Sequence, residues 1–284
     1  MHAGKSITAP VFRPIIENAQ SRGRLVLVCE HASNHIPEAW GDLGLSAAQR
    51  VAHIAWDPGA LGLARQLAQR LDAVLVHAPV SRLVYDCNRA PDMPGAMPAR
   101  SEIHDIPGNA AITPQERARR TAAVYVPFHD GLHALLMRRM ALGLRPVVIT
   151  IHSFTPVYFG QPRAVEFGVI QDADPTLAAL ILSGAQAAGT LTSALNEPYS
   201  AKDDVTHTLR LHAAPRAEAP VSRSYTLSLA AGDWLRRDEV YGAQMALRDQ
   251  LIDHLSALPY VRLNGHRVNR LPGNVNVSVR FVEG

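Results

Sequence analysis

The sequence predicts an α/β fold in which a mostly parallel or mixed sheet is covered by helices on both faces. Strand-length apolar runs alternate with segments of helical apolar spacing, which is the pattern of such three-layer folds. With 284 residues, 47% of them hydrophobic and 19% charged, the chain can bury a full core at the upper end of single-domain size. We therefore expect one αβα domain over residues 1–284, with residues 1–20 as an extension.

The expected strands end in polar residues. The apolar run at 25–29 stops abruptly at Glu30, and His31 follows. A second run begins after Ala73, and a third, over 145–151, leads directly to His152. Ligands in an open α/β sheet collect at the carboxyl ends of the strands. Polar residues at three such ends predict one shared site.

A helix is expected directly after Asp57. Residues 58–73 carry apolar side chains at helical spacing, and a proline lies near the first turn, where its missing N–H costs nothing. Asp57 is thus at or just before a helix start. Its ordinary role there would be an N-cap, which contributes about 1 kcal/mol.

The middle of the chain continues the alternation. The sequence TPQE at 113–116 is typical of a capping box, and it opens a long helix with an expected irregularity at Pro127. A buried strand is expected over 165–171 and a helix over 175–188, closed by Gly189.

A stretch rich in Pro and Gly lies between Asp86 and Pro114. Loops of this length in compact domains are often lids or binding loops. We therefore expect a lid or a binding loop here.

The composition favours some partners over others. The formal net charge is +3, but Lys and Arg are scattered, which favours solvated helix faces over a nucleic-acid surface. No apolar run approaches the roughly 20 residues of a membrane span, and the N-terminus lacks an export signal. Two cysteines argue against a disulfide framework. The sequence thus predicts a cytoplasmic protein that acts on a small molecule, without nucleic-acid or membrane partners, and leaves the oligomeric state open.

Three of the thirteen histidines stand out. His31 and His152 follow apolar strands directly, and His53 lies four residues before Asp57. A combination of His, carboxylate and His at separate segment ends matches a catalytic zinc site, which takes three N or O ligands and leaves a position for water. Neither HExxH nor CxxC occurs, so this metal prediction depends on the predicted fold.

Five motifs occur in order over roughly residues 20–212: CEHASNHIP, HIAWDPGALGLA, SRLVYDCNRAPD, TIHSFTPVYFG and NEPYS. Together they resemble the N-formylglutamate amidohydrolase family. The resemblance implies a phosphorylase/hydrolase-like fold related to the zinc carboxypeptidases. It also implies that the metal, zinc or another divalent ion, binds to His31, Asp57 and His152.

The same resemblance implies a site for the substrate carboxylate. The Asn-Arg pair of the DCNR stretch, Asn88 and Arg89, corresponds to the pair with which such enzymes hold a carboxylate, and Arg82 also matches the family pattern. An amidase for an N-acyl acidic amino acid needs such a group, because guanidinium binds carboxylate through a planar fork. The structural alternative for both arginines is an ion pair with Asp86 or Asp92.

One position departs from the family pattern. The resemblance implies a proton-shuttling Glu in a late apolar strand, and the best match, residues 224–230, places Ser228 there. Losing a general base typically costs about 10²- to 10⁴-fold in rate. Glu197 is the expected replacement, with a position in a surface loop as its structural alternative, and Glu166 is the other candidate. Glu30 would instead orient a ligand histidine.

The sequence therefore predicts a metal-dependent hydrolase of N-acyl amino acids, with N-formylglutamate or a similar small N-acyl acidic amino acid as substrate. One alternative is a non-catalytic or weakly active member that binds an amino-acid-like ligand, which Ser228 favours. A further alternative is a zinc amidase or peptidase that cuts another amide. A serine hydrolase is disfavoured because no GxSxG motif occurs.

Overall fold

A mixed sheet forms the centre of the computed structural model. The structure describes residues 10–172, 175–213, 224–230, 253, 261–264 and 276–279. Within these residues the strand order is β1-β3-β2-β6-β11-β9-β10. Strands β3, β2, β6 and β11 are mutually parallel, whereas β1 and β9 run antiparallel to their neighbours β3 and β11, and β10 is parallel to β9. The strands are β1 (Ile15–Glu17), β2 (Leu25–Cys29), β3 (Val74–His77), β6 (Val147–Phe154), β9 (Phe167–Ile170), β10 (Ser193–Leu195) and β11 (Ser224–Ala230).

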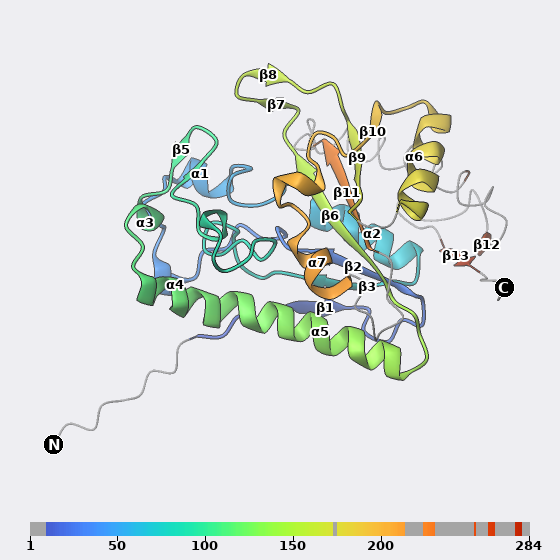
Figure 1. Ribbon diagram of the computed structural model, residues 1–284, viewed down its shortest axis with the longest axis horizontal. Helices are drawn as coiled ribbons and strands as arrows, with labels where there is room; N and C mark the ends of the chain where they lie inside the picture. Colours follow the sequence, from blue (N-terminus) through green and yellow to red (C-terminus); the bar gives the residue numbers. More distant parts are fainter. Residues whose placement is uncertain are drawn as a thin grey trace.

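Helices cover both faces of this sheet (Figure 1). Successive side chains of a strand point to opposite faces, and β2 shows the result. Val26 and Val28 pack in one core cluster with Phe128 of α5, while Leu27 packs in a second cluster with Leu67 of α2. The predicted three-layer αβα arrangement with a mixed sheet is confirmed. The covering helices are α2 (Ala60–Arg70) and α6 (Thr176–Ala188) on one face and α5 (Val126–Ala141) on the other.

Shorter elements form the connections. The stretch between Asp86 and Pro114 contains the hairpin β4–β5, and a second hairpin, β7–β8, follows β6; both project from the sheet (Figure 1). The shorter elements are η1 (Glu38–Trp40), α1 (Ala47–Val51), η2 (Pro94–Ala96), β4 (Arg100–Ser101), β5 (His104–Asp105), α3 (Pro107–Ala110), α4 (Pro114–Arg120), η3 (Thr121–Tyr125), β7 (Val157–Tyr158), β8 (Gln161–Pro162), η4 (Ala201–Asp203), α7 (His207–Ala213), β12 (Val261–Asn264) and β13 (Asn276–Val279).

The predicted strands and helices are present, with shifted ends. The strand expected over 145–151 runs on to Phe154, so His152 lies inside β6 rather than after it. The helix α6 ends at Gly189, whose φ of 64° is the left-handed conformation that closes helices. The predicted long helix is interrupted by the π-helical turn η3 directly before α5, and Pro127 lies in the first turn of α5, where no N–H is needed.

Two expectations need correction. Asp57 is not the N-cap of α2, because Gly59 holds that position with a φ of 83°, a conformation that glycine adopts without strain. The Asp57 side chain instead contacts His31 and His152. Part of the expected extension belongs to the sheet, since β1 pairs with β3, where Glu17 binds Arg65 and His77 at 2.8 and 2.9 Å. Residues 1–9 lie outside the described residues.

No helix among the described residues is long and apolar enough to cross a membrane.

The packing of α5 against the sheet leads to a stability prediction. Phe128 is fully buried, whereas Met137 of the same helix is 50% exposed. We expect Phe128→Ala to lower the free energy of unfolding by about 3–5 kcal/mol through lost burial and a residual cavity. Met137→Ala, the matched control, should change it by no more than about 0.5 kcal/mol. Urea denaturation measures both, and equal effects would contradict the assigned core.

Candidate metal centre and substrate cavity

Three elements carry the predicted metal ligands to one place. His31 follows β2, His152 lies near the end of the neighbouring strand β6, and Asp57 precedes α2. The backbone N–H of Asp57 donates to the carbonyl oxygen of His31 at 2.9 Å, which joins the start of α2 to the end of β2. Local backbone geometry thus positions all three side chains.

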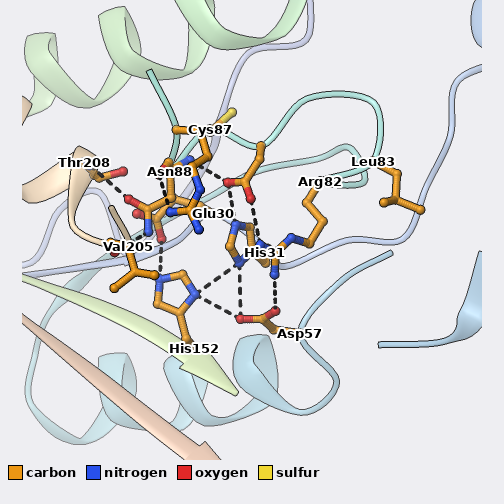
Figure 2. A network of polar contacts seen from close by, with 12 residues as sticks. Glu30, His31, Asp57, Arg82, Leu83, Cys87, Asn88, His152, Val205 and Thr208 are labelled. Atoms are coloured by element: carbon orange, nitrogen blue, oxygen red, sulfur yellow. Dashed lines mark hydrogen bonds and ion pairs between the residues drawn. The ribbon is translucent and has the colours of Figure 1, made fainter. Parts of the chain in front are cut away.

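The three side chains meet around one carboxylate oxygen (Figure 2). Oδ2 of Asp57 lies 2.9 Å from Nδ1 of His152 and 3.3 Å from Nδ1 of His31, and the two ring nitrogens lie 3.2 Å apart. All three residues are buried, and one atom from each lies within 4.8 Å of the others. Such a convergence of two imidazoles and a carboxylate can hold a divalent metal ion.

A second layer of carboxylates stands behind the two histidines. Nε2 of His31 lies 2.8 Å from Oδ1 of Asp86, and Nε2 of His152 lies 3.4 Å from Oε2 of Glu30. Metal-binding histidines commonly present their second nitrogen to a carboxylate, which fixes the ring and its tautomer. Each imidazole therefore has its Nδ1 directed at the common point.

The attraction between the histidines and the carboxylates determines which of them are charged. Burial lowers the pKa of His152, but the hydrogen bond with Asp57 and the contact with Glu30 outweigh this and raise it to about 10. Burial by itself raises the pKa of the Asp57 carboxyl. The charges and hydrogen bonds of His31 and His152 have the larger effect and lower this pKa far below its ordinary value. Without a metal, His152 is therefore charged at neutral pH and Asp57 is ionised.

The donor set fits a divalent cation. Glu30, Asp57 and Asp86 are each at least 96% buried, and Arg82 binds two of them, at 3.3 Å to Asp57 and 2.7 Å to Asp86. Burying charge is costly unless it is compensated. A cation bound to His31, Asp57 and His152 would supply that compensation with the N and O ligands that divalent metals take.

These residues form one wall of a small cavity of about 240 Å³. This volume is below the roughly 300–1,000 Å³ of pockets for drug-sized ligands, so the cavity suits a small molecule. The residues that line it are His31, His53, Ile54, Trp56, Asp57, Pro58, Arg82, Asn88, Arg89, Ser101, Glu102, His152, Ser153, Phe154, Thr155, Tyr158, Ile170, Tyr199, Val205 and Ser228.

The three predicted substrate-binding residues all line this cavity, but their contacts differ. Arg82 already binds two carboxylates, which is the ion pairing expected as its structural alternative. The side-chain amide of Asn88 donates to the carbonyl of Val205 at 2.7 Å and accepts from the N–H of Thr208 at 3.1 Å. Among the described residues, Arg89 donates to backbone carbonyls, those of Asn88 and Asp204. Of the two guanidinium groups, that of Arg82 forms ion pairs with carboxylates of described residues and that of Arg89 forms none.

The structure separates the candidates for the general base. Ser228 is buried in the cavity wall, opposite His152 in the pairing of β11 with β6. Glu197 and Glu166 are both exposed, neither lines the cavity, and Glu166 accepts the backbone N–H of Thr192 at 2.8 Å. The structure thus does not bring either glutamate to the predicted ligands.

Sequence reasoning gave no role to two residues of the site. Asp86 stands within the SRLVYDCNR motif, where only its pairing with arginine was considered. Glu102, which lies 2.6 Å from His53 and lines the cavity, comes from the Pro- and Gly-rich stretch. The expectation of a lid or binding loop in this stretch was the available signal, but it pointed to no single residue.

The sequence matches the family model of the N-formylglutamate amidohydrolases over residues 23–222. The chain belongs to the N-formylglutamate amidohydrolase family. The resemblance seen in the five motifs is thereby confirmed. Membership of the N-formylglutamate amidohydrolase family supports an amidohydrolase-type function and the assignment of this chain as a hydrolase.

Two solved structures are similar. The gene product Atu2144 from Agrobacterium tumefaciens is 46% identical with a TM-score of 0.78, and the match covers 87% of this chain and 96% of that one. The N-formylglutamate amidohydrolase from Ralstonia eutropha JMP134 is 18% identical with a TM-score of 0.56, and the match covers 88% of this chain and 97% of that one. The second similarity concerns the fold alone.

A short stretch is also similar to another protein. Over 40 residues the chain is 48% identical to the cysteine desulfurase IscS from Methanosarcina thermophila, which is 14% of this chain and 10% of that protein. The chain thus spans a tenth of this curated relative, and the match bears on no activity.

The raised pKa of His152 leads to a prediction about metal binding. A metal ion binds a neutral imidazole. Because the pKa of His152 is about 10, its ring is protonated at pH 7, and metal binding at this pH must release that proton. We expect the release of at least one proton per ion, and an affinity that rises about tenfold per pH unit between pH 6.5 and 8.5. Calorimetry in buffers of different ionisation enthalpy measures the release.

The exposed His35 provides the control for this experiment, since His35→Ala should leave the proton release unchanged. An affinity independent of pH, with no proton released, would contradict the assigned protonation.

Proposed function

We propose that this protein hydrolyses the amide bond of N-acyl amino acids, with N-formylglutamate or a similar small N-acyl acidic amino acid as substrate. One observation carries the proposal: the cluster of His31, Asp57 and His152 shares a single cavity of about 240 Å³ with Arg89. A metal centre for the amide and a cation for a carboxylate are the two requirements of such a reaction.

His31, Asp57 and His152 would hold the metal, zinc or another divalent ion. When bound, it would polarise the amide carbonyl and lower the pKa of an attacking water toward about 7. Asp86 and Glu30 keep the two imidazoles oriented for this role, and Arg82 partly compensates the buried carboxylates.

The substrate carboxylate would bind to Arg89. Its guanidinium lines the cavity and is tethered through Nη1 to backbone carbonyl oxygens, which fixes its place without neutralising its charge. The other donors of the planar fork suit a bidentate carboxylate. The small cavity volume favours a formyl or similarly small acyl group.

We further propose that the protein acts on this free small molecule in the cytoplasm, without nucleic-acid or membrane partners. Both cysteines are buried and free, which suits a reducing compartment. The low net charge of +3 gives no support to a nucleic-acid partner.

Ser228 favours a second candidate function. A neutral hydroxyl lies in the cavity wall beside His152, at the position where the family resemblance implies a glutamate. A protein that keeps the cavity but not the proton transfer would bind N-acyl amino acids without hydrolysing them. Hydrolysis by the unmodified chain decides between the two.

The proposal is tested with metal-loaded protein and two matched substrates, N-formylglutamate and its neutral diamide. Unmodified protein should hydrolyse the acid, and Arg89→Ala should raise the KM for the acid by about 10- to 100-fold, because a charge-assisted hydrogen bond contributes roughly 1.5–3 kcal/mol. The KM for the diamide should change little.

Arg138→Ala is the control for charge, since Arg138 is exposed on α5 and does not line the cavity. Unchanged KM values for both substrates in Arg89→Ala would refute the carboxylate site. Binding without turnover by the unmodified protein would establish the second candidate function.

A further inference from the structure

Hydrolysis of an amide needs a group that moves one proton. The attacking water must lose a proton, and the leaving amine must gain one. Ser228 cannot serve near neutral pH, and the expected replacement Glu197 is not in the cavity wall. The group must therefore be sought among the other residues that line the cavity.

Most of the ionisable residues in the wall are committed or unsuitable. His31, Asp57 and His152 bind one another around the common point, and the two arginines stay charged. The two tyrosines carry phenols, which ordinarily lose their proton only near pH ~10. Among the described residues of the wall, this leaves His53 and Glu102.

His53 and Glu102 form a close pair. Nε2 of His53 lies 2.6 Å from Oε2 of Glu102, and their side chains are 36% and 12% exposed. The other carboxylate oxygen, Oε1, accepts the backbone N–H of Phe159 at 3.1 Å. Glu102 is a turn residue of the β4–β5 hairpin with a φ of 51°, which residues other than glycine adopt uncommonly. Its carboxylate is therefore fixed at both oxygens by two separate loops.

This geometry leaves one imidazole nitrogen available. In a neutral imidazole that donates from Nε2 to the carboxylate, Nδ1 carries no proton. No hydrogen bond joins this Nδ1 to another described residue. A carboxylate that fixes the tautomer and orientation of an imidazole is the arrangement by which hydrolases prepare a histidine to accept a proton.

We infer that His53 is the catalytic residue that transfers the proton, and that Glu102 is its positioning residue. This inference rests on the proposed amide hydrolysis. As the water oxygen bonds to the carbonyl carbon, Nδ1 of His53 takes one proton from that water. As the bond from carbon to nitrogen breaks, the same proton passes to the leaving amine, and the second water proton stays with the new carboxylic acid. His53 returns to its neutral form, so the step balances.

A purely structural role explains the pair less well. Partly exposed ion pairs contribute little to stability, and this pair faces the same cavity as the metal ligands.

The test compares His53→Ala and Glu102→Gln with His104→Ala. His104 lies in the same hairpin as Glu102 and does not line the cavity. In metal-loaded protein of unchanged metal content, His53→Ala should lower kcat about 10²- to 10⁴-fold, and added imidazole should restore part of the lost rate. Glu102→Gln should lower kcat less, and His104→Ala should leave it unchanged.

A second readout does not depend on activity. Nitrogen NMR of metal-free protein should show the His53 ring protonated at Nε2 in the unmodified chain, with this preference lost in Glu102→Gln. A His53 protonated at Nδ1 in the unmodified chain would overturn the inference, even if His53→Ala failed to fold.

The outcomes separate the two proposals. Active unmodified protein with full activity in His53→Ala overturns the role of His53 and leaves the proposed function standing. Unmodified protein that binds metal but hydrolyses no N-acyl amino acid overturns both. Loss of rate in His53→Ala with rescue by imidazole supports both.

Discussion

The Asp57 carboxylate joins four parts of the chain at one point. Its Oδ2 faces Nδ1 of His31, after β2, and Nδ1 of His152, in β6, and it accepts the backbone N–H of Ser153 at 3.2 Å. Its Oδ1 accepts from Arg82, in the segment after β3. A buried charge that loses its partners is strongly destabilising. The mutual positions of β2, β3, β6 and the start of α2 are therefore coupled to this one side chain.

The site has two parts, a floor at the ends of β2 and β6 and the start of α2, and a wall made of loops. In the floor, the carboxylates of Asp86, from the segment after β3, and Glu30 contact the second nitrogens of the two imidazoles. The wall includes residues of the β4–β5 and β7–β8 hairpins, which the contact of Glu102 with the backbone N–H of Phe159 links, and His53, which also contacts Glu102. Loops on a rigid scaffold commonly carry specificity. In the proposed function, the floor would hold the metal ion, and the wall would bind the substrate and transfer the proton.

Periodicity and strand ends predicted the floor well, because both are local properties. The run that ends at Glu30 and the helix after Asp57 could be read directly from apolar spacing, and parallel strands bring their carboxyl ends together. The wall could not be predicted in this way. The contact of Glu102 with His53 spans 49 positions, and the exposure of Glu197 depends on where β10 ends. The N-cap expected for Asp57 failed because tertiary contacts with two histidines outweighed a local hydrogen bond.

In the proposed function, His31, Asp57 and His152 bind one divalent ion. Anomalous diffraction from crystals grown with zinc, collected on both sides of the zinc absorption edge, tests it directly. We expect a single strong peak within coordination distance, about 2.0–2.2 Å, of Nδ1 of both histidines and a carboxylate oxygen of Asp57. A fully occupied ion bound elsewhere, with this cluster retaining its direct hydrogen bonds, would contradict it.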